Sequence, residues 1–249
     1  MPDTLTAYQI LLLFIAAMGI GISKCGFAGV SMIHVLVFAF VFGAKDSTGV
    51  LLPMLVIGDL LAIWFFGKKV EWKQVRRLLP PAMLGVIIGT VLMDRMDERT
   101  FKPTVGVIIF LLTTVQVARI WRPKLFDQIP HQLWFAWTLG LLAGTTTMMA
   151  NAAGPVVALY LLAVALPKLE LVATSAWFFL TINLFKLPFS YWLGLIGGGS
   201  LTIDFMFAPG ILIGMLAGRW MVNKIPQKQF DSLLLAFTAL AALRLIGLI

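Results

Sequence analysis

The sequence has few charged residues and almost no cysteine or histidine. Only 12% of its 249 residues are charged, whereas an average soluble domain carries about 25%, so an ordinary soluble globular protein is excluded. One cysteine, Cys25, excludes an intrachain disulfide and a multi-cysteine metal site. Because the two histidines are far apart in the chain and no phosphate-binding glycine loop is present, we expect no metal and no other cofactor.

The sequence contains long runs without any charged residue. Hydrophobic residues make up 60% of the chain, and no charged residue occurs within 4–23, 25–44 or 128–167. A helix that spans a bilayer needs about 20 apolar residues. The net charge of +8 comes from lysines and arginines in short loops, so we expect a lipid bilayer and no nucleic acid as partner. The pattern predicts an all-α polytopic membrane protein, a multi-pass protein of the cell inner membrane.

Ten apolar segments follow one another without a soluble domain between them. Their ranges are 8–23, 26–43, 47–67, 75–93, 102–119, 131–149, 153–166, 171–193, 203–222 and 229–247. The motif Gly85-x-x-x-Gly89 recurs 129 residues later, and other residues repeat at offsets of 126 and 127. We therefore predict two related halves, an N-terminal transmembrane repeat over 1–125 and a C-terminal one over 126–249. Chance similarity between glycine-rich helices is the alternative.

The charges of the loops differ in opposite senses between the two halves. The loop 68–77 has a net charge of +4 and its counterpart 194–203 has none, whereas 94–102 is balanced and its counterpart 219–231 has +2. Because positively charged loops stay in the cytoplasm, we expect 68–77, 119–127 and 219–231 inside, and the other two loops and both termini outside. The repeats are thus predicted to have inverted topology, which is typical of secondary transporters.

Each half begins with segments that are too short to cross a bilayer. As helices, 30–44 and 156–166 would be about 22 and 17 Å long, and the hydrocarbon core is about 30 Å thick. We therefore expect each repeat to be a short helical hairpin followed by three transmembrane helices, with hairpin tips at 23–29 and 149–155. Irregular backbone at that depth needs protein or a water-filled cavity around it, and inversion brings the two tips together near the midplane.

The residues at these tips resemble a known family. Gly21-Ile22-Ser23-Lys24-Cys25-Gly26-Phe27 is similar to the first-hairpin signature of the TauE/SafE family of sulfite and organosulfonate exporters. The second half contains, in the family's order and spacing, Met149-Ala150-Asn151-Ala152-Ala153-Gly154-Pro155, Tyr160-Leu161-Leu162, Leu166-Pro167-Lys168, Trp177-Phe178-Phe179 and Asn183-Leu184-Phe185-Lys186-Leu187-Pro188. The resemblance covers essentially the whole chain and implies an exporter of sulfur-containing oxyanions. Many members have consecutive glycines where this chain has Cys25-Gly26-Phe27-Ala28-Gly29, a departure that concerns the substrate more than the fold.

Lys24 lies between two uncharged runs of 20 residues. Placing a lysine at the bilayer centre costs about 2.5–3.5 kcal/mol, so we expect Lys24 to have either an interaction partner or a functional role. We expect it to bind an anion together with the backbone N–H groups of Gly26 and Gly29, since the N-terminus of a helix attracts anions. The alternative is a lysine whose ammonium reaches the outer interface along its own stem.

The second tip offers Asn151, which follows three threonines. Its side chain would either cap the helix that begins after Gly154 or donate a hydrogen bond to a substrate oxygen. Thr146 and Thr147 are weaker candidates as ligands, because hydroxyls in apolar surroundings usually bond to carbonyls of their own helix.

A second lysine, Lys186, lies deep in an apolar segment, and Asn183 shares its helical face. Under the 127-residue offset, Lys186 falls opposite Asp59, the acid placed well inside an apolar segment. Either these two form a structural ion pair, or Lys186 binds substrate and Asp59 is a proton carrier or counter-ion. His34 is either a proton relay or a histidine that is hydrogen-bonded within the bundle.

Together these residues predict a secondary transporter and not an enzyme. A membrane enzyme would need paired carboxylates, a histidine cluster or an activated nucleophile. Lys24, Asp59 and Lys186 sum to +1, which favours a small anion such as sulfite, sulfoacetate or a related sulfonate, bound at the repeat interface near the midplane. An anion channel and a proton-coupled transporter of small carboxylates are the alternatives. The glycine motifs are interpreted first as packing within the bundle and second as a homodimer contact.

Overall fold

The computed structural model describes residues 5–27, 29–121, 133–164 and 166–224. The helices are α1 (Ala7–Ser23), α2 (Val30–Phe42), α3 (Asp46–Phe66), α4 (Trp72–Arg95), α5 (Glu98–Trp121), α6 (Leu133–Ala150), α7 (Gly154–Ala163), α8 (Lys168–Trp192) and α9 (Gly198–Lys224), with a 3₁₀ turn η1 (Gly67–Lys69) after α3. No strand occurs in these ranges. Each of the first nine predicted apolar segments corresponds to one helix, and the tenth, 229–247, lies outside the described residues.

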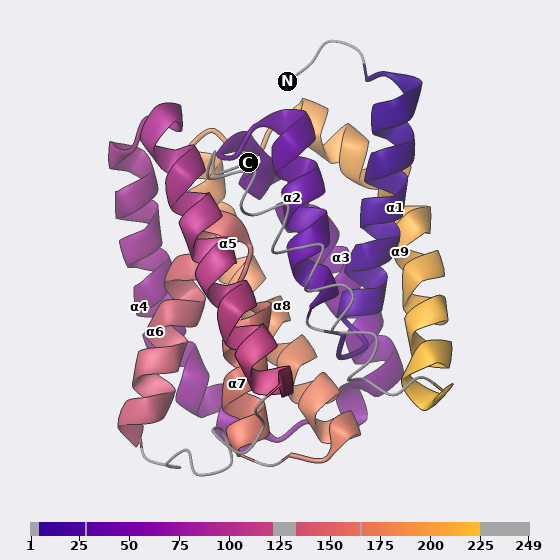
Figure 1. The fold of residues 1–249 in the computed structure, drawn as a ribbon, viewed down its shortest axis with the longest axis vertical. Helices are drawn as coiled ribbons and strands as arrows, with labels where there is room; N and C mark the ends of the chain where they lie inside the picture. Colours follow the sequence, from indigo (N-terminus) through magenta and orange to yellow (C-terminus); the bar gives the residue numbers. More distant parts are fainter. Residues whose placement is uncertain (1–4, 28, 122–132, 165, 225–249) are drawn as a thin grey trace.

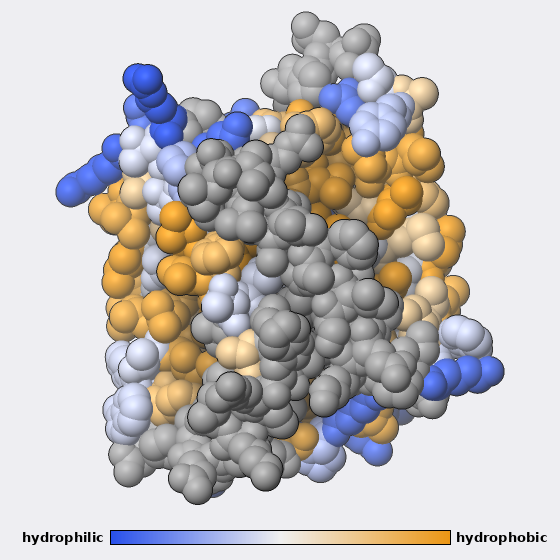
Figure 2. All heavy atoms as spheres, viewed as in Figure 1, coloured by the Kyte–Doolittle hydropathy of each residue, from blue (hydrophilic) through white to orange (hydrophobic). Residues whose placement is uncertain are grey.

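Long apolar helices make up most of the bundle (Figure 1). Five stretches are long and apolar enough to cross a membrane: Asp46–Lys69, Trp72–Arg95, Leu133–Ala150, Lys168–Trp192 and Thr202–Met221. Figure 2 shows hydrophobic residues along the two sides of the visible face and the most hydrophilic residues near its two ends. The prediction of a polytopic helical membrane protein is confirmed.

Two short hairpins interrupt the long helices where the sequence predicted them. The first turns between Ser23 and Val30, and the second between Ala150 and Gly154. The turns need backbone with positive φ, which Gly26 supplies at 98° and Asn151 at 51°; glycine adopts it freely, and asparagine is one of the few other residues that tolerate it. With 13 residues in α2 and 10 in α7, the return helices are about 20 and 15 Å long.

Glycines let the first helix of each hairpin contact a long helix of the other half of the chain. A Cβ added at Gly144 in α6 would overlap the backbone oxygen of Ala82 in α4, and one added at Gly214 in α9 would overlap that of Met18 in α1. Close backbone approach of this kind is the ordinary use of small residues in membrane helices. The interpretation of the glycine motifs as packing within the bundle is confirmed.

The central pair, α3 and α8, carries three fully buried polar side chains. The side chains of Asp59 on α3 and of Asn183 and Lys186 on α8 are at most 1% exposed. In Figure 1 the α4–α5 and α8–α9 connections lie at the same end as the start of α1, and the connection between α3 and α4 lies at the opposite end. The two loops expected outside therefore share one end of the bundle.

Candidate functional site

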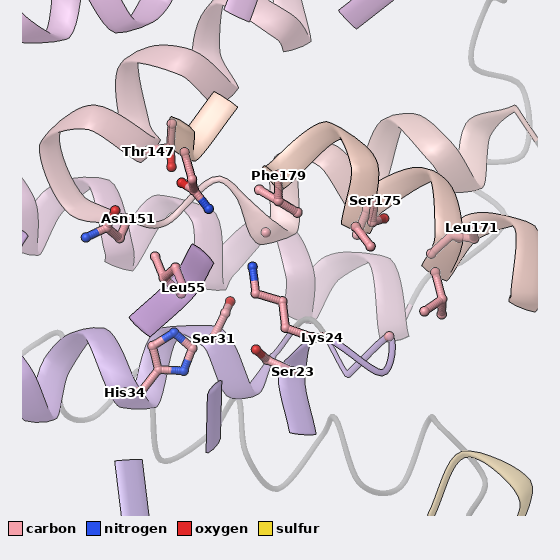
Figure 3. Close-up of a pocket in the computed structure, with 16 residues that line it drawn as sticks. Ser23, Lys24, Ser31, His34, Leu55, Thr147, Asn151, Leu171, Ser175 and Phe179 are labelled. Atoms are coloured by element: carbon pink, nitrogen blue, oxygen red, sulfur yellow. The ribbon is translucent and has the colours of Figure 1, made fainter. Parts of the chain in front are cut away.

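A cavity of about 70 Å³ lies between the two hairpin tips. The first tip contributes Lys24 and Gly26, and the second contributes Asn151. Figure 3 shows Lys24, Ser31 and His34 on one side of this space and Thr147 and Asn151 on the other. Residues that are more than 100 positions apart in the sequence thus face one small cavity.

Lys24 is held by an ion pair. Its Nζ lies 2.6 Å from Oδ1 of Asp59, and its side chain is 10% exposed. The ammonium also lies 4.8 Å from the centre of the Phe179 ring, a distance at which a cation is attracted to an aromatic face. The alternative in which Lys24 reaches the outer interface is wrong, because the side chain ends on a buried carboxylate.

The second carboxylate oxygen of Asp59 is hydrogen-bonded to a residue of α8. Oδ2 of Asp59 accepts a hydrogen bond of 2.8 Å from Nδ2 of Asn183, whose side chain also lines the cavity. Asp59 itself is fully buried behind the lining. The alternative in which Lys186 and Asp59 form an ion pair is therefore wrong, because Asp59 is paired with Lys24 and supported by Asn183.

Lys186 instead bonds to the second tip. Its Nζ donates to Oδ1 of Asn151 over 2.5 Å and to Oγ1 of Thr147 over 3.3 Å. The side chain is 1% exposed, and it lies behind these two partners and not in the cavity wall. Neither of these partners carries a negative charge, and both line the cavity, so neutral side chains lie between the ammonium of Lys186 and the cavity.

Asn151 joins the two halves of the chain. While its Oδ1 accepts from Lys186, its Nδ2 donates over 2.9 Å to the backbone oxygen of Thr48 at the start of α3. The interpretation of Asn151 as the cap of α7 is wrong, because both ends of the amide are used elsewhere. Its positive φ is the reason that α6 ends here, as left-handed residues commonly end helices.

The other expected ligands divide into two groups. Thr147 lines the cavity, whereas Oγ1 of Thr146 donates to the carbonyl of Leu142 in its own helix over 2.7 Å. The N–H of Gly26 donates to the carbonyl of Ser23 over 3.2 Å, and Gly29 is not part of the cavity wall. The expected cradle of free amide groups at the first tip is therefore not formed at Gly26.

His34 lines the cavity without any partner. It is 1% exposed, and neither Nδ1 nor Nε2 has a hydrogen bond. The interpretation of His34 as a histidine satisfied within the bundle is wrong, because its ring faces the cavity and both nitrogens remain unbonded.

Sequence reasoning missed several wall residues and one buried acid. Ser175 and Phe179 line the cavity with Asn183, and their spacing of four along α8 puts them on one face, a signal that could have found them. Asp204 directly follows the predicted loop 194–203, but α9 already begins at Gly198. Its carboxylate is 2% exposed, has no partner, and borders a separate apolar cavity of about 340 Å³.

Comparison with known proteins identifies the family of the chain. The searches of curated proteins and of solved structures give no match. A family model described as "Sulfite exporter TauE/SafE" matches residues 12–245, which include both hairpin tips and the central pair α3 and α8. The chain therefore belongs to the sulfite exporter TauE/SafE family.

Proposed function

We propose that this protein is a secondary transporter of the cell inner membrane that exports a small sulfur oxyanion, with sulfite as the first candidate. The observation that carries the proposal is the cavity between the hairpin tips, which Lys24 and Asn151 enter from different halves of the chain. The family model supports the class of substrate. A ligand in this cavity contacts both halves at once, as alternating access requires.

The charge around the cavity favours an anion. Lys24 and Asp59 neutralise each other, while Lys186 rests on the neutral Asn151 and Thr147. This leaves one positive charge in surroundings of low dielectric, where an unpaired charge is costly. An anion would restore neutrality and accept charge-assisted hydrogen bonds.

The family model selects among the expected anions, because its description names sulfite. Sulfoacetate and taurine-derived sulfonates carry several more heavy atoms. We therefore take sulfite before the larger sulfonates as the substrate to test.

The halves 1–125 and 126–249 are proposed to be inverted repeats. The contacts support this. Asn151 lies 127 positions after Lys24, and Lys186 lies 127 positions after Asp59. Lys24 is bonded to Asp59, and in the same way Asn151 is bonded to Lys186. The contact of α1 with α9 likewise has its counterpart in that of α6 with α4. In such a transporter the two halves exchange conformations, and the site faces each side of the membrane in turn.

Export needs no nucleotide in this scheme. An inside-negative potential favours outward movement of an anion by about 2.3 kcal/mol per charge per 100 mV. The proposed cycle therefore consists of sulfite binding from the cytoplasm, exchange of the two halves and release outside.

The experiment is sulfite transport in proteoliposomes that contain the purified protein, with counterflow as the readout. We expect saturable exchange that is lost in Lys186→Met and kept in the matched control Lys73→Met, because Lys73 is exposed. Uptake without counterflow would indicate the channel alternative. Exchange of small carboxylates without any sulfur oxyanion would overturn the proposed substrate.

A further inference from the structure

The cavity extends along α8 but not along its counterpart α3. Residues of α8 line it at successive turns from Leu171 to Asn183, a length of about 18 Å at 1.5 Å per residue. Figure 3 shows Leu171, Ser175 and Phe179 in a row along this helix. Among the described residues of α3, Leu55 alone lines the cavity. Because α3 and α8 occupy equivalent places in the two proposed repeats, this difference indicates a conformation that is open on one side.

The α8 part of the cavity lies at the end of the bundle that carries the basic connection 68–77. Nε1 of Trp177 donates to the carbonyl of Gly67 over 3.2 Å, and the N–H of Glu71 donates to Oγ1 of Thr174 over 3.0 Å. Ser175 follows Thr174 directly and lines the cavity. Since the connection is expected in the cytoplasm, this face of α8 leads from the hairpin tips toward the cytoplasm.

At the equivalent place in α3, a hairpin tip is bonded to the helix. The offset of 127 relates Ser175 to Thr48, and the backbone oxygen of Thr48 accepts a hydrogen bond of 2.9 Å from Nδ2 of Asn151. The counterpart of Asn151 is Lys24, which is paired with Asp59 and shares the cavity wall with Ser175. The second tip is thus attached to the start of α3, whereas the cavity lies between the first tip and α8.

A glycine permits a close contact at the closed end. A Cβ added at Gly49 would overlap the backbone oxygen of Leu195, which belongs to the connection between α8 and α9. The equivalent residue of α8 is Ala176, which already has a methyl group and lines the cavity. The helix with the glycine is therefore closed, and the helix with the alanine is open.

We propose that the structure is the conformation open toward the cytoplasm, in which the anion enters along the face of α8 that contains Ser175. After the two halves exchange conformations, the anion leaves along the face of α3 that contains Thr48. The bond from Asn151 and the close contact of Gly49 hold this exit closed in the present conformation. The inference rests on the proposed function and adds the route that the substrate takes.

The first test measures access to Ser175→Cys and Thr48→Cys from each side of the membrane. Inside-out and right-side-out vesicles are treated with a membrane-impermeant methanethiosulfonate, without sulfite because sulfite would react with the reagent. Cys25 is buried and should give little background. Ser175→Cys should react at least about tenfold faster in inside-out vesicles, because the rate follows the population that is open to that side. Thr48→Cys should react at least about tenfold more slowly than this in both preparations.

The second test opens the exit. Adding Gly49→Ala to Thr48→Cys should raise its reaction rate in right-side-out vesicles at least about tenfold, because the new methyl group prevents closure and shifts the population. The matched control is Gly197→Ala in the same connection as Leu195, where a Cβ meets nothing within 4 Å, and it should leave the rate unchanged. Asn151→Gly removes the amide that is bonded to Thr48 and should also raise the rate, so the test does not depend on a single folded variant.

The outcomes separate the inference from the function on which it rests. Reaction of Ser175→Cys from outside only, or equally from both sides, would overturn the inference and leave sulfite export standing. A rate for Thr48→Cys that neither Gly49→Ala nor Asn151→Gly raises would also overturn it, since these contacts would not close the exit. Labelling as expected in a protein that shows no sulfite counterflow would overturn the proposed function and support the route for another solute.

Discussion

The ammonium of Lys24 lies 2.6 Å from the carboxylate of Asp59. The lysine that faces the cavity is therefore neutralised within its own half of the chain. The positive charge that this pair does not cancel belongs to Lys186, which lies behind Asn151 in the other half, and in the proposed function this charge attracts the anion. One half supplies a neutral ion pair and the other supplies the charge, so the two tips contribute differently to the same site.

Breaking the Lys24–Asp59 pair should destabilise the protein. Lys24→Met leaves a fully buried carboxylate with Asn183 as its remaining partner, and removing one partner of a buried pair costs about 3–5 kcal/mol. Adding Asp59→Asn removes the unpaired charge, so the double variant should recover most of the loss. Thermal unfolding in detergent measures both. Equal stability of Lys24→Met and the unmodified protein would contradict the pair.

Asn151→Asp should abolish anion binding without unfolding the chain. The new carboxylate would neutralise Lys186, which lies at hydrogen-bond distance, and aspartate tolerates the positive φ of this position. Asn151→Gly keeps the backbone conformation but removes the amide, so it should weaken sulfite binding by about 1–3 kcal/mol, the value of a buried hydrogen-bond partner. Calorimetric titration compares the two. Undiminished binding in Asn151→Asp would show that the surplus charge lies elsewhere.

The helices and tips could be predicted because their signals are local. Uncharged runs predict buried helices, and the short stretches after Gly29 and Gly154 predict the two hairpins. The partners of the charges were not predictable in this way. Asp59 and Lys186 fall opposite each other in the predicted repeats, but Asp59 is paired with Lys24 and Lys186 is bonded to Asn151.

Other parts of the site depend on how helices rotate against one another. The sequence places His34 on a helix, but the contacts of α2 with its neighbours decide that its ring faces the cavity unbonded. Asp204 was missed for a different reason. An acid near a glycine-rich stretch is typical of a loop, and the start of α9 at Gly198 buries it instead.

A methyl group at the closest helix crossing should not be tolerated. The Cβ of Gly144→Ala would overlap the backbone oxygen of Ala82 in α4, which cannot move aside as a side chain would. Overpacking of this kind costs about 1–3 kcal/mol or more. The control is Gly197→Ala, where a Cβ meets nothing within 4 Å and the stability should change by less than about 0.5 kcal/mol. Similar unfolding temperatures of the two variants would contradict the close crossing of α4 and α6.

Labelling from outside the cell should distinguish the two ends of the bundle. The connection after α3 carries a net charge of +4 over 68–77, and its counterpart 194–203 carries none, so the first should be cytoplasmic. Cys25 is buried and gives an unlabelled background. A membrane-impermeant maleimide should modify Gly199→Cys and not Lys73→Cys in intact cells, and both after lysis. Labelling of Lys73→Cys alone, or of both in intact cells, would contradict the inverted repeats.

The two buried aspartates should respond oppositely to the same substitution. Asp204 has no hydrogen-bond partner and borders an apolar cavity, so Asp204→Leu removes a polar group whose burial costs about 1–3 kcal/mol without compensation and should raise the unfolding temperature. Asp59→Leu should lower it, because Lys24 and Asn183 lose their shared partner. Sulfite counterflow should persist in Asp204→Leu, since the residue lies outside the cavity between the tips. A more stable Asp204→Leu protein that no longer transports sulfite would show instead that this carboxyl takes part in the cycle.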